Sequence, residues 1–244
     1  MSILDNQTHH ELETWRRMLS RSLAAISVVE GITERPGSIR LGGGTVLSAM
    51  WGHRHSKDVD LFTNDAQILA YMRPWLNDDI ANLLGEQCSE SANSLKFEMQ
   101  GGAVDIVAAS DVLPDAKPTI EHWNGYDVLI EDPAEIIAKK LYHRSNRVTL
   151  RDYVDIAEGL KQMPGLADRL RSHIPGSIKV AAETLKQASD DKLALQYESI
   201  RFIGDPIPLK NVLSKARAAL AELQYTDEER FLMAQGRGGN GIGN

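Results

Sequence analysis

Strand-like and helix-like segments alternate over the first 130 residues of the chain, and the remainder is almost entirely helix-like. Short segments with the length or alternation of β-strands occur at residues 38–41, 58–62, 95–100, 103–108 and 126–130. Later in the chain, apolar residues follow helical spacing over residues 133–144, 149–162, 165–173, 177–198 and 208–223. This pattern predicts an α+β (α/β) fold followed by a C-terminal helical domain.

Helix signals also occur within the first part of the chain. An amphipathic helix is expected at residues 9–30, ended by Gly31 and the turn at residues 34–37, and a short helix at residues 46–51. Asp132 and Pro133 have the residue types of a helix N-cap and first helical position, and they mark the domain boundary. We therefore predict domains at residues 1–131 and 132–235, and a disordered Gly/Asn-rich tail at 236–244.

Composition limits the cellular setting. The single cysteine, Cys88, excludes an intramolecular disulfide, and no apolar run is long enough to cross a bilayer. The first residues lack the basic start and apolar stretch of a secretory signal. We expect a cytoplasmic protein with no membrane partner. The net charge of −7 argues against a general nucleic-acid coat protein but permits a local basic site.

Two carboxylates stand two positions apart in the segment Asp58-Val59-Asp60. Side chains at such positions of a strand share one face, and their repulsion is relieved by a cation. Asp105 is the one charge in another apolar strand segment, so pairing of the two strands would bring three carboxylates together. Such a set suits two metal ions roughly 4 Å apart in phosphoryl transfer. A solvated strand edge is the alternative for the Asp-x-Asp segment alone.

Glycines precede the acidic segment in Gly42-Gly43-Gly44-Thr45. Gly43 and Gly44 would let backbone N–H groups approach a triphosphate at a helix N-terminus, and Thr45 could add a hydroxyl. The sequence is neither a dinucleotide fingerprint, since Leu47 takes the last glycine position, nor a Walker loop. A structural tight turn is the alternative for the glycines alone.

Taken together, these motifs resemble the nucleotidyltransferase superfamily of DNA polymerase beta type. More narrowly, the chain is similar to the AbiEii/AbiGii family of nucleotidyltransferase toxins, which pairs Gly-Gly-Thr with Arg-x-Ser-x-Asp-hydrophobic-Asp-Leu-Phe. Here the second pattern runs from Arg54 to Phe62. The family's Lys-Leu and Arg-Asp-x-x-Asp patterns match Lys140-Leu141 and residues 151–155. The resemblance covers residues 38–160.

The resemblance implies a mixed sheet flanked by helices, with a helical domain behind it. It implies Mg²⁺, with Mn²⁺ as an alternative ion, and an NTP substrate. The implied metal-binding and catalytic carboxylates are Asp58, Asp60 and Asp105. The implied second functional group contains Lys140 and Asp155, with Arg151 and Asp152 as further candidates. The implied nucleotide-binding residues are Gly43, Gly44, Thr45, Arg54, Ser56 and Arg151.

The residues themselves support a cationic site near Lys140. Lys140, Arg144, Arg147 and Arg151 would share one face of a continuous helix, although Ser145-Asn146 could break it. A solvated helix face is the alternative. Asp152 and Asp155 would repel each other unless a cation such as Arg151 or Lys140 lay near, so a structural salt-bridge network is also open.

The predicted activity is transfer of NMP from an NTP to an acceptor hydroxyl, with release of pyrophosphate. The resemblance points to an RNA acceptor, best the 3′ end of tRNA, in a toxin of a toxin–antitoxin or abortive-infection system with a cognate antitoxin. Two alternatives remain open: a degenerate fold that binds nucleotide or protein without chemistry, and transfer to protein or to small molecules.

Overall fold

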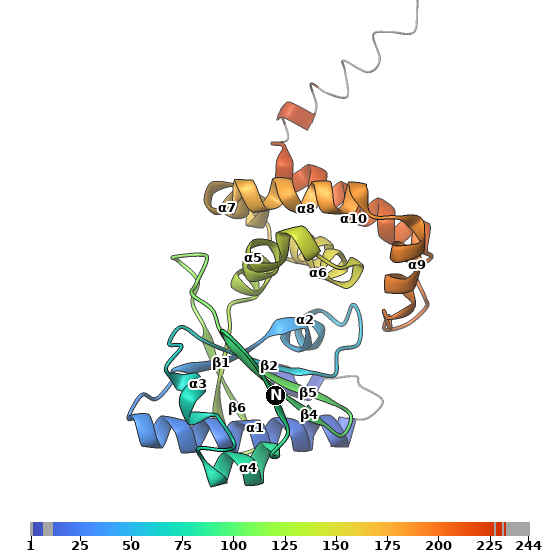
Figure 1. The fold of residues 1–244 in the computed structure, drawn as a ribbon. Coiled ribbons are helices and arrows are strands. Elements are labelled where there is room, and N and C mark those ends of the chain that lie inside the picture. Colours follow the sequence, from blue (N-terminus) through green and yellow to red (C-terminus); the bar gives the residue numbers. More distant parts are fainter. Residues whose placement is uncertain (1, 7–11, 227, 231, 233–244) are drawn as a thin grey trace, which may run out of the picture. The chain divides into compact units, whose positions relative to one another are not determined.

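The computed structural model describes residues 2–6, 12–226, 228–230 and 232. They divide into two compact units, one of Met1–Ile136 with Arg201–Asp205 and the other of Ile137–Ile200 with Pro206–Asn244 (Figure 1). The predicted tail at residues 236–244 lies outside the described residues, as does the start of the helix expected at residue 9.

A mixed sheet forms the centre of the first unit. In the described residues it has seven strands in the order β3-β4-β5-β2-β1-β7-β6. Strands β2 and β5, and β1 and β7, pair in parallel, whereas the other neighbours are antiparallel. The strands are β1 (Ile39–Gly42), β2 (Val59–Thr63), β3 (Cys88–Ser91), β4 (Ser94–Met99), β5 (Gly102–Ala108), β6 (Thr119–Trp123) and β7 (Tyr126–Ile130).

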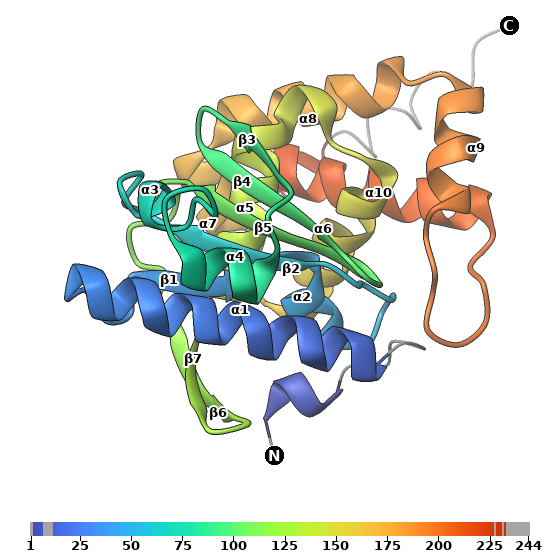
Figure 2. The same cartoon turned by 60° about the horizontal axis from the view of Figure 1, so that its bottom comes forward.

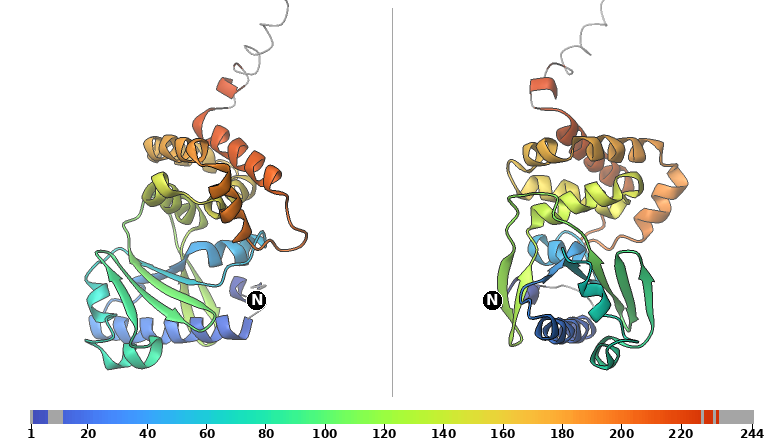
Figure 3. Two further views of the ribbon diagram at one scale, coloured as in Figure 1. Left: turned by 45° about the vertical axis from the view of Figure 1, so that its right-hand side comes forward. Right: turned by 60° about the vertical axis from the view of Figure 1, so that its left-hand side comes forward.

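The sheet has one apolar and one polar face near its centre. Alternate residues of β2 are fully buried, as strand periodicity requires, and α1 (Leu12–Thr33) runs along this apolar face (Figures 2 and 3). Helix α1 continues past Gly31, where it was expected to end. The Thr33 hydroxyl donates to the Val29 carbonyl and so supports the extra residues. The opposite face carries Asp60.

Short helices join these strands. Helix α2 (Gly43–Trp51) begins three residues before the predicted start at 46, so the glycines form its first turn, and Gly52 ends it in the left-handed region. Helices α3 (Ile68–Tyr71) and α4 (Asp78–Leu84) follow β2, with Asn77 capping α4. A short 3₁₀ helix, η1 (Ile3–Asn6), contacts α2.

The second unit is helical. Helix α10 packs on α6, α7 and α8, and buried Tyr153 donates its hydroxyl hydrogen bond to the Ala181 carbonyl at 2.6 Å. Residues 177–198 form two helices rather than the predicted one, because Ser189 caps a new helix with its side chain. The elements are α5 (Pro133–Arg144), η2 (Ser145–Arg147), α6 (Leu150–Gln162), α7 (Leu166–His173), α8 (Pro175–Gln187), α9 (Asp190–Glu198) and α10 (Leu209–Gln224). Within the described residues, none of these helices could span a membrane.

Candidate functional site

Strand register brings two of the predicted carboxylates side by side. Asp60 on β2 lies directly opposite Asp105 on β5, and on its other side it lies opposite Gly42 at the end of β1. Directly opposite residues present their side chains to the same face of a sheet. Asp58 stands two residues before Asp60, and its Oδ1 accepts a hydrogen bond from the Ala103 N–H at 3.1 Å. The two acidic strands therefore pair, which is the condition for bringing their carboxylates together.

The charge on this face is unfavourable without a counterion. Burial, followed by the charge of Asp60, raises the pKa of Asp105 to about 6; the charge of Lys96 opposes the rise and that of Asp58 adds to it. Among the residues that the structure describes, no group of three His, Cys, Asp or Glu side chains forms a ready metal cage. Mg²⁺ commonly takes only one or two protein carboxylates and completes its shell with water and phosphate oxygens. The donor set fits such an ion, and the metal role of the three residues stays a prediction.

The glycines are required by close packing on two sides of the first turn of α2. Gly43 has φ = 69°, and a Cβ there would lie 1.9 Å from Asp60 Oδ2. A Cβ on Gly44 would lie 2.4 Å from Arg54 Nη2 and 3.2 Å from Ser56 Oγ. The turn thus lies between an acidic and a basic side chain, with no room for any residue but glycine at position 43.

The side chains around this turn that were predicted to bind nucleotide form hydrogen bonds with other residues of the chain. Arg54 is only 1% exposed, and its Nη1 donates to the His55 carbonyl at 3.0 Å. The buried Thr45 hydroxyl donates to the Asp58 carbonyl and lies 3.1 Å from Ser56 Oγ. These contacts connect the glycine turn to Asp58, the residue directly before β2. Direct contact of Thr45, Arg54 and Ser56 with a nucleotide stays a prediction.

The second predicted group forms a buried ion cluster within the second unit. Lys140 Nζ on α5 lies 2.6 Å from Asp152 Oδ1 and 3.1 Å from Asp155 Oδ2, both on α6. Burial alone would raise the pKa of Asp152, but the charges of Lys140 and Arg144 and the Lys140 hydrogen bond lower it to about 2. The cation expected beside the two aspartates is therefore Lys140. Arg151 is exposed to solvent on α6.

Asp152 has a second structural task. Its Oδ2 accepts hydrogen bonds from the Thr149 N–H at 3.1 Å and the Thr149 hydroxyl at 2.8 Å, and the Thr149 hydroxyl in turn caps the Asp152 N–H. This reciprocal capping box fixes the start of α6. The same carboxylate thus joins the helix start to the lysine of the preceding helix.

The continuous basic helix face does not form. Helix α5 ends at Arg144, the 3₁₀ turn η2 covers residues 145–147, and α6 starts only at Leu150. The break suggested by Ser145-Asn146 is therefore real, and the η2 turn that replaces the helix contacts α8. Lys139 and Lys140 are buried, whereas Arg144, Arg147 and Arg151 are exposed.

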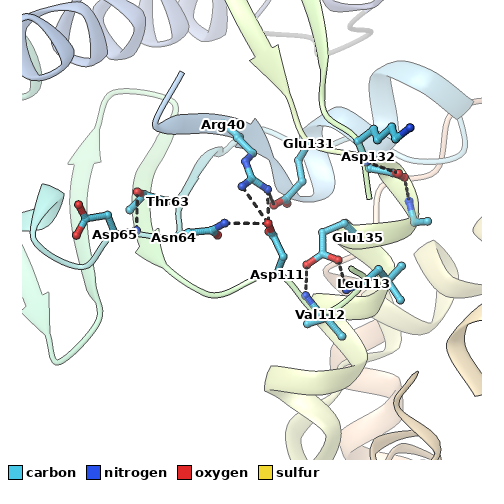
Figure 4. A network of polar contacts seen from close by, with 12 residues as sticks. Arg40, Thr63, Asn64, Asp65, Asp111, Val112, Leu113, Glu131, Asp132 and Glu135 are labelled. Atoms are coloured by element: carbon cyan, nitrogen blue, oxygen red, sulfur yellow. Dashed lines mark hydrogen bonds and ion pairs between the residues drawn. The ribbon is translucent and has the colours of Figure 1, made fainter. Parts of the chain in front are cut away.

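A polar network beside the glycine turn was not predicted. Arg40, two residues before Gly42 on the same strand, donates to both carboxylate oxygens of Asp111 at 2.7 and 3.1 Å, and Asn64 donates to Asp111 at 2.8 Å (Figure 4). Buried Glu131 lies against Gly42, where a Cβ would come within 2.7 Å of its Oε2. The network fixes the loop after β5 to β1.

The mixed sheet, its helices and the glycine turn beside paired carboxylates define a nucleotidyltransferase-type fold. A crystal structure from H. pylori classed as a nucleotidyltransferase shares it, with a TM-score of 0.50 and 12% identity, covering 92% of this chain and 98% of that one. The fold is also similar to MenT4, a nucleotidyltransferase toxin from Mycobacterium tuberculosis H37Rv, with a TM-score of 0.47 and 14% identity over 88% and 90% of the two chains.

The sequence itself identifies the family. A family model described as "Nucleotidyl transferase AbiEii toxin, Type IV TA system" matches residues 34–237. The chain therefore belongs to the AbiEii family of nucleotidyltransferase toxins. No curated protein sequence matches the chain.

Proposed function

We propose that this chain is an enzyme that transfers NMP from an NTP to an acceptor hydroxyl, with the 3′ end of tRNA as the favoured acceptor. The reaction depends on Mg²⁺, with Mn²⁺ as an alternative ion. The observation that supports it most is the register of Gly42, Asp60 and Asp105 across three strands. It brings the glycine turn and two acids together on one face. Membership of a nucleotidyltransferase family supports the same activity.

The glycine turn and the three aspartates have separate proposed roles. The first-turn N–H groups of α2 at Gly43 and Gly44 bind phosphate oxygens of the NTP, aided by the positive end of the helix. Asp58, Asp60 and Asp105 hold the cation, which when bound neutralises charge developing on the phosphoryl oxygens. Asp105 also helps to orient or deprotonate the acceptor hydroxyl.

The lysine cluster has a separate proposed role. Lys140 and Asp155 form the second functional group implied by the family resemblance, with Lys140 as its catalytic cation. Both aspartates hold Lys140 through short contacts.

A labelling reaction tests the activity. The full chain is incubated with Mg²⁺, each α-labelled NTP in turn, and total tRNA, with Asp60→Asn as the matched inactive variant. We expect label in RNA with the wild type and a loss of at least 100-fold in the variant. Label on the chain itself would redirect the proposal to protein nucleotidylation. Nucleotide binding without label or pyrophosphate would contradict the enzymatic proposal and favour a binding module.

Membership of a toxin–antitoxin family supports a cognate antitoxin and a cytoplasmic target. We therefore expect expression of the chain in bacteria to arrest growth, and Asp60→Asn to relieve the arrest at equal protein level. Growth arrest that persists in this variant would show that toxicity does not depend on the proposed transfer.

A further inference from the structure

The row of paired residues that carries the candidate site extends one strand beyond Asp105. On β4, Lys96 lies directly opposite Asp105, on the side away from Asp60. Lys96 therefore presents its side chain to the same face as the two acids. Read across the sheet, the row is Gly42, Asp60, Asp105 and Lys96, with the glycine turn at one end and a cation at the other.

Lys96 is electrostatically part of this face and still reaches solvent. Its hydrogen bond to Glu98 raises the pKa of Lys96, burial opposes the rise, and the charges of Asp105, Glu98 and Asp58 add to it. The ion pair from Lys96 Nζ to Glu98 Oε1 measures 2.7 Å, and the lysine side chain is 44% exposed. An ammonium group has three N–H donors, so this pair leaves donors for a ligand.

The in-line geometry of phosphoryl transfer indicates which end of this row of residues faces the leaving group and which faces the acceptor. The attacking and leaving oxygens lie roughly in line on opposite sides of the phosphorus. If the NTP phosphates lie at the glycine turn, the leaving pyrophosphate departs toward Gly43. The acceptor hydroxyl then approaches from the Asp105 side, where Lys96 lies.

We propose that Lys96 binds an acceptor phosphate, the phosphodiester that precedes the attacking terminal hydroxyl of an RNA strand. The inference rests on the proposed function and adds a specificity to it: the acceptor must carry an anionic group beside its hydroxyl. Neither a neutral nor a cationic small-molecule acceptor offers such a group. Lys96 makes a charge contact and takes no part in bond breaking.

Binding tests the inference without any need for turnover. A short single-stranded RNA with 5′-fluorescein and a free 3′ hydroxyl is titrated with the full chain by fluorescence anisotropy over a series of salt concentrations. Lys96→Ala should weaken binding about fivefold and reduce the log–log salt slope by about 0.7, the value for one phosphate contact to a single strand. Lys96→Arg keeps the charge and should bind within about twofold of wild type.

Lys161→Ala is the matched control, because Lys161 also forms an exposed pair with a nearby glutamate, Glu158, at 2.9 Å. It should leave RNA affinity and the salt slope unchanged. Equal affinities for wild type and Lys96→Ala, or equal losses in the two alanine variants, would overturn the inference. So would a wild-type chain that binds no RNA.

The labelling reaction supplies the second arm. Lys96→Ala should raise the KM for tRNA about fivefold and leave the KM for NTP unchanged. A higher KM for NTP with an unchanged KM for tRNA would place Lys96 at the donor nucleotide and overturn the inference. If the wild type labels no acceptor, the proposed function fails by itself and the anisotropy result still decides the role of Lys96.

Discussion

At the scale of single residues, Gly43 and Gly52 are a matched pair with opposite surroundings. Both have positive φ, but a Cβ on Gly43 would collide with Asp60, whereas a Cβ on Gly52 would meet nothing within 4 Å. Gly43→Ala should therefore displace the Asp60 carboxylate and lower kcat at least 100-fold, since a shift of about 1 Å in a catalytic group can cost that much. The measurement is the labelling rate at saturating NTP and tRNA.

Gly52→Ala controls for the backbone. It should cost about 1 kcal/mol of unfolding free energy, because alanine is disfavoured in the left-handed region, and should leave kcat within about twofold. An active Gly43→Ala variant would show that Asp60 is not held by contact with the glycine turn.

Asp152 predicts a pH dependence of stability. Its pKa is about 2 in the folded chain, below the ordinary value of 3.8, so the folded state favours its ionised form. Its contribution to the unfolding free energy is therefore complete above about pH 4 and is lost as the pH falls toward 2. Asp152→Asn should cost about 3 kcal/mol at pH 7, because it leaves part of the Lys140 charge buried without its partner, and should flatten the curve over this window. Urea unfolding at several pH values measures both effects.

Asp168→Asn is the control for that series. Asp168 pairs with Arg171 at the surface, and its side chain is 79% exposed. Exposed pairs of this kind contribute little, so the change should be under about 1 kcal/mol at every pH. If the two variants behaved alike, the cluster around Lys140 would not be acting as a buried ion pair.

At the scale of elements, Glu135 links the first turn of α5 to the loop after β5. Its Oε1 and Oε2 accept hydrogen bonds from the N–H groups of Val112 and Leu113, each at 2.8 Å, and the side chain is fully buried (Figure 4). Glu135→Ala leaves both donors without this acceptor, at a cost of about 3 kcal/mol. Glu135→Gln keeps one accepting oxygen and should be intermediate in urea unfolding. Equal stabilities of the glutamine and alanine variants would argue against two independent hydrogen bonds.

The central strands β2 and β5 were predictable from two different local patterns. In β2 buried and half-buried residues alternate, and Asp58-Val59-Asp60-Leu61 shows the start of this alternation in the sequence, whereas β5 is a short apolar run interrupted only by Asp105. The two strands that were missed, β3 and β6, form the edges of the sheet, and most of their residues are exposed or half-buried. Without a buried face, an edge strand carries little alternation.

The Asp58-Val59-Asp60 segment and the glycine turn were also predictable, because each is a pattern of neighbouring residues with its own geometry. The Arg40 network was not, because Arg40 and Asp111 are 71 residues apart and meet only through the fold. Lys96 was missed in the same way. A lysine at a polar position of a half-buried strand has no sequence signal of its own. Only the register with β5 places Lys96 beside Asp105.

At the scale of the whole molecule, the first unit is discontinuous in sequence. Residues Arg201–Asp205 belong with residues 1–136: the His55 N–H donates to the Arg201 carbonyl at 2.7 Å, and Arg54 forms a β-bridge with Phe202. Both contacts lie in the segment that leads from the glycine turn to the acidic strand. A fragment of residues 1–136 alone lacks them and should be less stable than the same fragment joined through a Gly/Ser linker to residues 201–205.

The difference should be about 1–2 kcal/mol, because one backbone hydrogen bond and the packing of Phe202 are restored. In a domain of this size that corresponds to a rise of roughly 3–8 °C in Tm, measured by circular dichroism. A fusion carrying the same five residues in scrambled order separates the specific bridge from the effect of added length. If the two fusions melted together, Arg201–Asp205 would be a neighbour of the first unit rather than a part of it, and the segment between Gly52 and Asp58 would hold its conformation unaided.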